Sequence, residues 1–202
     1  MTVLTTVSRR RVGRSALAAL TLWLAACAGE QALHSRLDER GRTWRSLDAP
    51  LALARPAPRF SRAARDYLYL APLEANNAGA RRHYLWVGLG TTVDRRWPWA
   101  APADAAMLLL TLDGTPLALP LDDWETAEGA ALYRASTPVY AVRRASVTLD
   151  ELARIVAATS VEALVVAPDG GVAEYTLWDG RWSDWAAFVA GTAADRPLGA
   201  SR

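Results

Sequence analysis

The chain has 202 residues, of which 51% are hydrophobic and 22% are charged, as is typical of a globular protein rather than a disordered one. All 23 basic residues are arginines, and the residues after position 26 carry 19 of them against 21 acidic residues, a net charge of −2. This balance excludes the strongly basic surface of a nucleic-acid-binding protein, and the single cysteine excludes an internal disulfide.

Residues 1–26 have the pattern of an export signal. Residues 8–15 (SRRRVGRS) are positively charged, and residues 16–26 form an uncharged apolar run. As a helix this run is about 16 Å long, roughly half the thickness of the hydrocarbon core of a bilayer. It is too short to span a membrane and typical of a signal-peptide core. The alternative is a buried helix of the domain, which does not explain the arginines in front of it.

The apolar run ends in Leu24-Ala25-Ala26-Cys27, which resembles the lipobox of bacterial lipoproteins. The resemblance implies that the chain is cut between Ala26 and Cys27, that the thiol of Cys27 receives a diacylglyceryl group, and that the new amino terminus is acylated. The residue after the cysteine is Ala28 rather than the Asp that favours inner-membrane retention in proteobacteria, which implies an outer-membrane address. A residue with three acyl chains is a stable membrane anchor. The resemblance covers about the first 30 residues and leaves the fold of the rest open.

Residues 27–65 are predicted to be the lipidated cysteine and a tether. Prolines at 50, 56 and 58 among alanines and arginines disfavour regular structure. A short helix is the alternative for the first half, although Gly41 disfavours it. Its apolar face would consist of Leu33, Leu37, Trp44 and Leu47.

Residues 66–202 are predicted to form one β-rich domain. Short apolar runs at 66–73, 83–94 and 106–112 are separated by turn signals at 76–79 and 113–114. Leu117, Leu119 and Leu121 alternate with Pro116 and Pro120, a pattern that is tolerated only in an edge strand. Residues 138–144 provide a further strand.

The last third of the chain has the clearest local signals. Thr148 and Glu151 match a capping box at the start of a helix over about 148–159. Two extended runs flank the turn at 168–171 and predict a hairpin. Ser183 is predicted to cap a helix over about 183–190. The expected fold class is mainly β or α+β, an antiparallel sheet or small sandwich of about six or seven strands with two short helices.

No catalytic or metal site is predicted. The chain has no G-x-S-x-G motif, and its two histidines, His34 and His83, are far apart in sequence and lack metal-ligand spacing. No cofactor is expected. The densest acidic cluster is the run from Asp122 to Glu128, beside Trp124. It contains Asp122, Asp123, Glu125 and Glu128, which is compatible with glycoside hydrolysis but is more typical of a solvated loop.

The glycines and the arginine pairs have structural interpretations. Gly88 and Gly90 lie late in an apolar run with no helix pattern after them, which favours a bulge or a close backbone approach over a phosphate loop. The arginine pairs at 81–82, 95–96 and 143–144 are predicted at strand edges, where they oppose aggregation. The alternative is contact with anionic lipid or glycan phosphates.

The segment Arg95 to Pro102 (RRWPWAAP) is the most suggestive candidate for binding. Trp97 and Trp99 flank a proline in an expected loop next to Arg95 and Arg96, where the rings are either a contact surface or folded back on the sheet.

The sequence therefore predicts a lipid-anchored cell-envelope protein that acts as a non-enzymatic accessory or binding module of a membrane complex, on the periplasmic face of the outer membrane. Its expected contacts are the membrane, through the lipid, and an envelope protein. The alternative is a periplasmic binder of a small ligand or glycan that uses Trp97 and Trp99 with Tyr84 or Trp86. A third reading is a hydrolase that uses the acidic cluster from Asp122 to Glu128.

Overall fold

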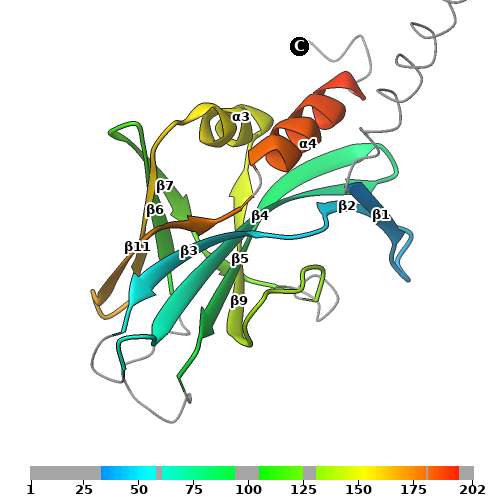
Figure 1. The fold of residues 1–202 in the computed structure, drawn as a ribbon. Helices are drawn as coiled ribbons and strands as arrows, with labels where there is room; N and C mark the ends of the chain where they lie inside the picture. Colours follow the sequence, from blue (N-terminus) through cyan, green and yellow to red (C-terminus); the bar gives the residue numbers. More distant parts are fainter. Residues whose placement is uncertain (1–32, 58–60, 94–104, 125–130, 181, 196–202) are drawn as a thin grey trace, which may run out of the picture. The chain divides into compact units, whose positions relative to one another are not determined.

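The computed structural model describes residues 33–57, 61–93, 105–124, 131–180 and 182–195. These residues belong to one compact unit, which runs from Ala32 to Arg202. Within the described part of the chain, eleven strands form a single antiparallel sheet with two helices at one end (Figure 1). This confirms the predicted mainly β architecture with two short helices, although the strands outnumber the six or seven expected.

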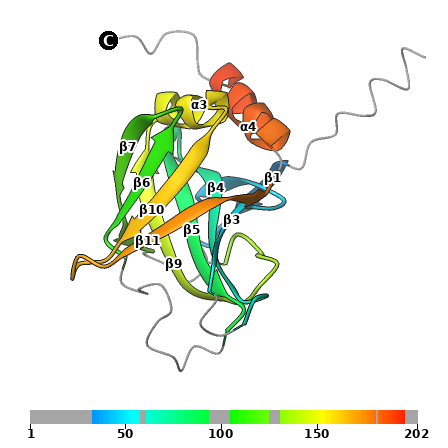
Figure 2. The ribbon, with the colours of Figure 1, turned by 60° about the vertical axis from the view of Figure 1, so that its left-hand side comes forward.

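The strands are joined mostly by short turns. They are β1 (Leu33–Leu37), β2 (Thr43–Leu47), β3 (Leu51–Pro56), β4 (Arg65–Asn77), β5 (Ala80–Thr91), β6 (Met107–Leu112), β7 (Thr115–Pro120), β8 (Asp122–Asp123), β9 (Val139–Val147), β10 (Val161–Val166) and β11 (Val172–Asp179). The order across the sheet is β7-β6-β10-β11-β3-β4-β5-β9-β8, and β2 pairs with both β1 and β4. The sheet curls so strongly that β7 comes close to β9, and it nearly closes on itself (Figure 2).

The predicted tether is wrong for residues 33–56, and so is the domain boundary at 65. Strand β3 lies inside the sheet between β11 and β4, and its first four residues are buried. Pro56 ends this strand rather than interrupting it, a position at which a missing amide hydrogen is tolerated. The continuous apolar run at 51–54 is the pattern of a strand buried on both faces, which the surrounding prolines obscured.

The alternative helix over the same segment is also wrong. Residues 33–47 form a β1–β2 hairpin, whose turn is held by the carboxylate of Asp38. This carboxylate accepts hydrogen bonds from the backbone amides of Arg40 and Arg42 at 2.9 and 2.8 Å and from the Trp44 indole at 3.1 Å. Gly41 has a φ of 74°, a backbone conformation that suits this turn and that other residues rarely adopt.

The predicted turns and the edge strand are confirmed. Asp113 and Gly114 have positive φ in the β6–β7 hairpin, and Gly170 has a φ of 85° in the β10–β11 hairpin. Strand β7, which contains Pro116 and Pro120, lies at one end of the sheet. These local signals depend on a few adjacent residues and are therefore visible in the sequence.

The two helices lie together at one end of the sheet (Figure 2). Helix α3 (Leu149–Ala157) begins with the predicted capping box, in which Glu151 N donates to Thr148 Oγ1 and Thr148 N donates to the Glu151 carboxylate. Helix α4 (Trp182–Ala194) starts before Ser183, so this residue is not its N-cap. Neither helix is long and apolar enough to cross a bilayer.

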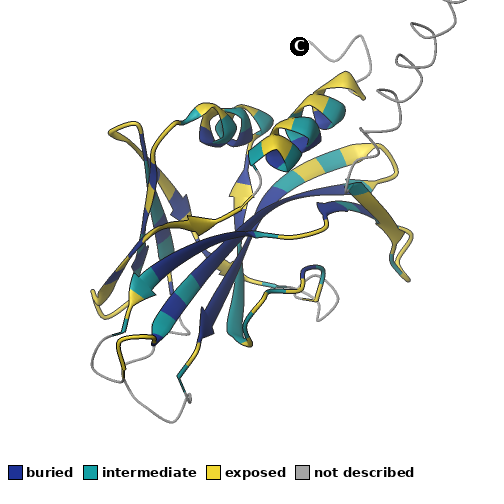
Figure 3. Ribbon diagram, viewed as in Figure 1, coloured by how far each residue is buried: buried dark blue, intermediate teal, exposed yellow. Residues whose placement is uncertain are grey.

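Strands β4 and β5 form the centre of the core and are buried on both faces along most of their length (Figure 3). Residues 131–138 cover one face, where the ring of Tyr133 lies 5.4 Å from that of Trp86. Gly88 lies on the same face, and a Cβ atom there would come within 2.5 Å of the Trp86 ring. The pairing of β5 with β9 is irregular between Leu89 and Gly90. The structure therefore confirms the close approach expected at these glycines, and the irregular pairing at Gly90 is compatible with the alternative of a bulge.

We expect the hydroxyl of Tyr133 to be a main support of this covering segment. It donates to Pro72 O at 2.6 Å and accepts from Leu47 N at 2.9 Å, which connects 131–138 to β4 and β2. Tyr133→Phe leaves two buried backbone groups without a partner and should lower the free energy of unfolding by about 1–3 kcal/mol. Chemical denaturation followed by tryptophan fluorescence measures this loss.

Tyr175→Phe is the matched control. Tyr175 is also fully buried, but its hydroxyl has no hydrogen-bond partner in the structure. Its removal should change stability by less than about 1 kcal/mol or raise it. An equal loss in both variants would show that the Tyr133 hydrogen bonds do not support the segment.

Candidate functional site

A polar row with a buried carboxylate at its centre crosses three strands at the end of the sheet that carries the helices. Arg45 of β2 lies opposite Glu74 of β4, and Glu74 lies opposite His83 of β5. The side chain of Glu74 is only 5% exposed, and its Oε2 lies 3.7 Å from His83 Nε2, within ion-pair range but beyond hydrogen-bond distance. Arg81 adds a cation, with its Nε 4.0 Å from Glu74 Oε1. The row therefore concentrates charge inside an otherwise apolar sheet.

The surrounding cations keep Glu74 ionised. Burial is the largest single influence on the pKa of this carboxyl and raises it. His83 and the charges of Arg81 and Arg45 together outweigh burial, so the pKa of Glu74 lies below its usual value. Arg45 in turn binds Asp195 at the end of α4, with 2.6 Å between Nη2 and Oδ2. Charges of alternating sign thus extend from α4 to β5.

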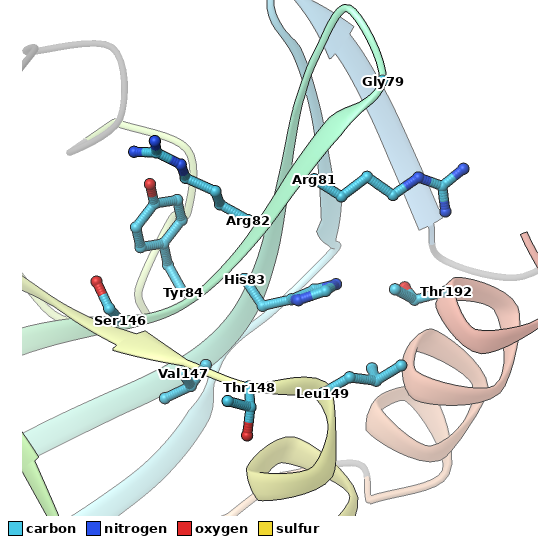
Figure 4. Close-up of a pocket in the computed structure, with 10 residues that line it drawn as sticks. All are labelled: Gly79, Arg81, Arg82, His83, Tyr84, Ser146, Val147, Thr148, Leu149 and Thr192. Carbon is cyan, nitrogen blue, oxygen red and sulfur yellow. The ribbon is translucent and has the colours of Figure 1, made fainter. Parts of the chain in front are cut away.

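A hollow of about 660 Å³ lies beside this row. Three parts of the chain form its wall, namely residues 79–84 of the β4–β5 hairpin, residues 146–149 at the junction of β9 with α3, and Thr192 of α4. We call it the hairpin pocket. Figure 4 shows the side chains of Arg81 and His83 pointing from β5 toward Thr192. The pocket exists because β9 ends at Val147, opposite His83, so the hairpin continues beyond its neighbour.

Several buried polar atoms at the hairpin pocket have no hydrogen-bond partner. They are Arg81 Nη1, His83 Nε2 and Thr192 Oγ1 in the wall, together with Glu74 Oε2 next to His83. Thr192 is only 3% exposed. Native proteins rarely leave such atoms unpaired, because each costs about 1–3 kcal/mol when it is removed from water without a partner. Because these atoms are concentrated around one hollow, a polar ligand bound there can supply their missing hydrogen bonds.

The opposite face of the hairpin carries an aromatic cluster. The ring of Tyr84 lies 6.4 Å from that of Trp44 and 6.3 Å from that of Trp124. The guanidinium of Arg42 lies 5.3 Å from the Trp44 ring centre, and that of Arg144 lies 5.5 Å from the Tyr84 ring centre. Tyr84 also borders the hairpin pocket, but its ring belongs to this cluster and points away from His83 and Thr192 (Figure 4).

Trp86, the other aromatic residue predicted for ligand binding, is 1% exposed and belongs to the core. A buried ring that packs against Tyr133 cannot contact a ligand from solvent.

Most of the predicted site residues lie outside the described part of the chain. These are Ala26, Cys27, Arg95, Arg96, Trp97 and Trp99, together with Glu125 and Glu128 of the acidic cluster. The described members of that cluster, Asp122 and Asp123, form the exposed strand β8, and Asp123 forms an ion pair with Arg143. Trp124 donates from Nε1 to Arg143 O at 2.9 Å.

The two histidines have separate environments. His34 lies in β1 and is hydrogen-bonded to Asp48, whereas His83 lies inside β5, in the wall of the hairpin pocket. In the part of the chain that the structure describes, no three His, Cys, Asp or Glu side chains are grouped so that they could hold a metal ion.

One feature of the sequence could have predicted the pairing of Glu74 with His83 in the polar row. A two-residue turn at Ala78-Gly79 pairs Asn77 with Ala80, and counting back along this hairpin brings Glu74 opposite His83. Glu74 was not singled out because it lies in a strand whose pattern is otherwise apolar. Arg45 and Thr192 could not be assigned, because β2 and α4 reach the site only through the tertiary fold.

Comparisons with known proteins found no match. No protein-family model matches the chain, no curated protein is significantly similar to it, and no solved structure matches it. Function must therefore be inferred from the side chains of the site.

We expect Glu74 to make stability depend on pH on the acid side. Because its pKa is lowered in the folded protein, ionised Glu74 contributes stability above its ordinary pKa of about 4.5, and this contribution is lost as the pH falls through the lower, folded-state pKa. Glu74→Gln should therefore reduce the loss of stability between pH 6 and pH 3, at a cost in stability at pH 7. Urea denaturation at a series of pH values measures both effects, and Glu162→Gln, at an exposed position in β10, is the control.

Proposed function

We propose that the domain is a binding module for a small ligand and that the hairpin pocket is its binding site. The observation that carries this proposal is the group of buried, unpartnered polar atoms around one hollow. This agrees with the ligand-binding alternative from the sequence but moves the site to the β4–β5 hairpin.

The dimensions and the lining of the pocket support this proposal. Its volume of about 660 Å³ falls within the range of roughly 300–1,000 Å³ that is usual for small-molecule sites. Val147 and Leu149 supply apolar surface, while Arg81, His83 and Thr192 supply polar atoms. Apolar walls with a few convergent polar groups are the common composition of such sites.

The pocket is also held by regular structure. Strands β5 and β9 carry part of the wall, and the capping box of α3 fixes the residues that follow β9. Helix α4 is connected to β2 by the ion pair between Asp195 and Arg45. A site built on strands and helices keeps its polar groups in fixed positions, which lowers the entropic cost of binding.

Filling the pocket tests the proposal. Saturation-transfer NMR on the full-length protein would be measured with two soluble probes of equal shape, 2-naphthoate and 2-naphthamide. We expect at least one probe to bind the unaltered protein. Leu149→Trp places a large ring in the wall and should weaken that binding by about tenfold or more, because it occupies the space of the ligand.

Val172→Trp is the control, since it introduces the same ring at a position that is 60% exposed and away from the pocket. It should leave binding unchanged. Thr192→Val is a milder second variant that keeps the shape of Thr192 but removes its hydroxyl, and it should weaken binding without lowering stability. If neither probe binds the folded protein, or if Leu149→Trp binds as well as Val172→Trp, the hairpin pocket is not a ligand site.

We propose further that the domain acts at a membrane face, held by lipid on Cys27. This rests on the likeness of Leu24-Ala25-Ala26-Cys27 to a lipobox. An anchor would keep the pocket near the bilayer, where the domain meets either a soluble ligand of the cell envelope or the other components of a membrane complex.

Cys27→Ser tests the anchor, because a hydroxyl cannot replace the thiol that accepts the diacylglyceryl group. In a lipoprotein-processing bacterial host, the variant should stay uncut and should lose labelling by radioactive palmitate. The unaltered chain expressed in parallel is the reference for both measurements. Equal labelling of the two proteins would contradict the assignment of Cys27.

A further inference from the structure

We infer that the ligand of the hairpin pocket is an anion, with one carboxylate or phosphate group attached to a compact apolar body. This inference rests on the proposed function and adds the chemical class of the ligand. It comes from the charge of the pocket wall, the pairing of the surrounding ions and the position of the apolar residues.

The described wall of the pocket carries positive charge. Arg81, Arg82 and His83 follow one another along β5, and no Asp or Glu is among the described residues of the wall. Figure 4 shows Arg81 and His83 directed toward α4, while Arg82 points to the other side of the strand. Arg81 and His83 are therefore the donors that a ligand inside the pocket meets, and Arg82 adds to the potential at its rim.

The neighbouring acids do not cancel this charge. Asp195 is bound to Arg45, and the single carboxylate of Glu74 is shared between Arg81 and His83 at 4.0 and 3.7 Å. Arg82 is exposed and has no acidic partner among the described residues. The described wall therefore carries more cationic than acidic groups, and Arg81 Nη1 and His83 Nε2 remain buried without hydrogen bonds. A carboxylate or phosphate oxygen is the acceptor that satisfies both.

The start of α3 is not the source of anion binding. Its capping box already pairs the amides of Thr148 and Glu151, and the Glu151 carboxylate places negative charge at this helix terminus. The recognition of an anion falls instead to Arg81 and His83, with the hydroxyl of Thr192 as an additional donor.

The apolar residues of the wall indicate which kind of group is attached to the anionic group of the ligand. Val147 at the end of β9 and Leu149 at the start of α3 line the pocket next to the cationic residues. A purely inorganic anion would leave this apolar surface in water. An anion with an attached ring or short chain covers this surface and gains affinity from the apolar area that is removed from water.

The charge preference is tested with the same isosteric probes. At pH 7, 2-naphthoate and 2-naphthamide differ in charge but hardly in shape. We expect the full-length protein to bind naphthoate about tenfold more tightly than naphthamide, because hydrogen bonds to an ionised group are stronger than those to a neutral one. Arg81→Gln should bring the two affinities to within about twofold of each other, and Arg81→Lys should restore part of the difference.

Arg154→Gln is the matched control, since Arg154 is an exposed arginine of α3 outside the pocket wall. It removes the same charge and should leave the preference for naphthoate unchanged. If the protein binds naphthamide as tightly as naphthoate, the anion inference fails while the proposed function stands. If neither probe binds, both fail.

A displacement experiment with lipid vesicles distinguishes the two sources of such an anion, a free molecule and a lipid headgroup. Vesicles of phosphatidylcholine with and without phosphatidylglycerol are added to the protein with naphthoate bound. We expect neither preparation to displace the probe, which assigns the pocket to a free anion. Displacement by the anionic vesicles alone, abolished by Arg81→Gln, would overturn that assignment and identify a headgroup as the source.

Discussion

The unequal length of two paired strands is the constraint on which the rest of the structure depends. Strand β9 ends at Val147, opposite His83, whereas its neighbour β5 begins at Ala80, so the β4–β5 hairpin extends beyond the pairing. The chain turns into α3 at this point, and α4 packs nearby against β2 and β4. The two helices cover the end of the sheet, and the space between them and the free hairpin edge becomes the hairpin pocket. A longer β9 would fill this space with backbone.

The same hairpin explains why polar groups can lie deep in the molecule. Its strands are buried on both faces, so any charged side chain in them needs a partner. At one end Asp66 is bound by Arg55 at 2.7 Å and by the Thr91 hydroxyl at 2.8 Å. At the other end Glu74 has cations nearby but lacks comparably close hydrogen bonds. Asp66 therefore belongs to a complete structural ion pair, whereas the site around Glu74 still has unpaired atoms.

The features that the sequence predicted are those that a few adjacent residues determine. The capping box of α3, the turns at 113–114 and 168–171, and the tight packing at Gly88 all follow from local chemistry. Strands β1 to β3 were missed because prolines near β3 masked its apolar run, and a spacing typical of helices masked the β1–β2 hairpin. Most of the candidate site could not be predicted, since Arg45, Glu74 and Thr192 come together only through strand register and helix packing. The sequence pointed instead to tryptophans and carboxylates that are adjacent in the chain, because such local clusters are visible without the fold.

The prolines of β7 affect how the molecule behaves beside copies of itself. The turn at 113–114 sets the pairing so that Pro116 and Pro120 occupy positions whose amides would point away from β6, toward the open edge. That edge therefore lacks two of the donors that another extended chain would need, and β7 and β9 lie close together without pairing as strands. The sheet stays almost closed without a continuous hydrogen-bonded ring, and its open border resists fibre growth.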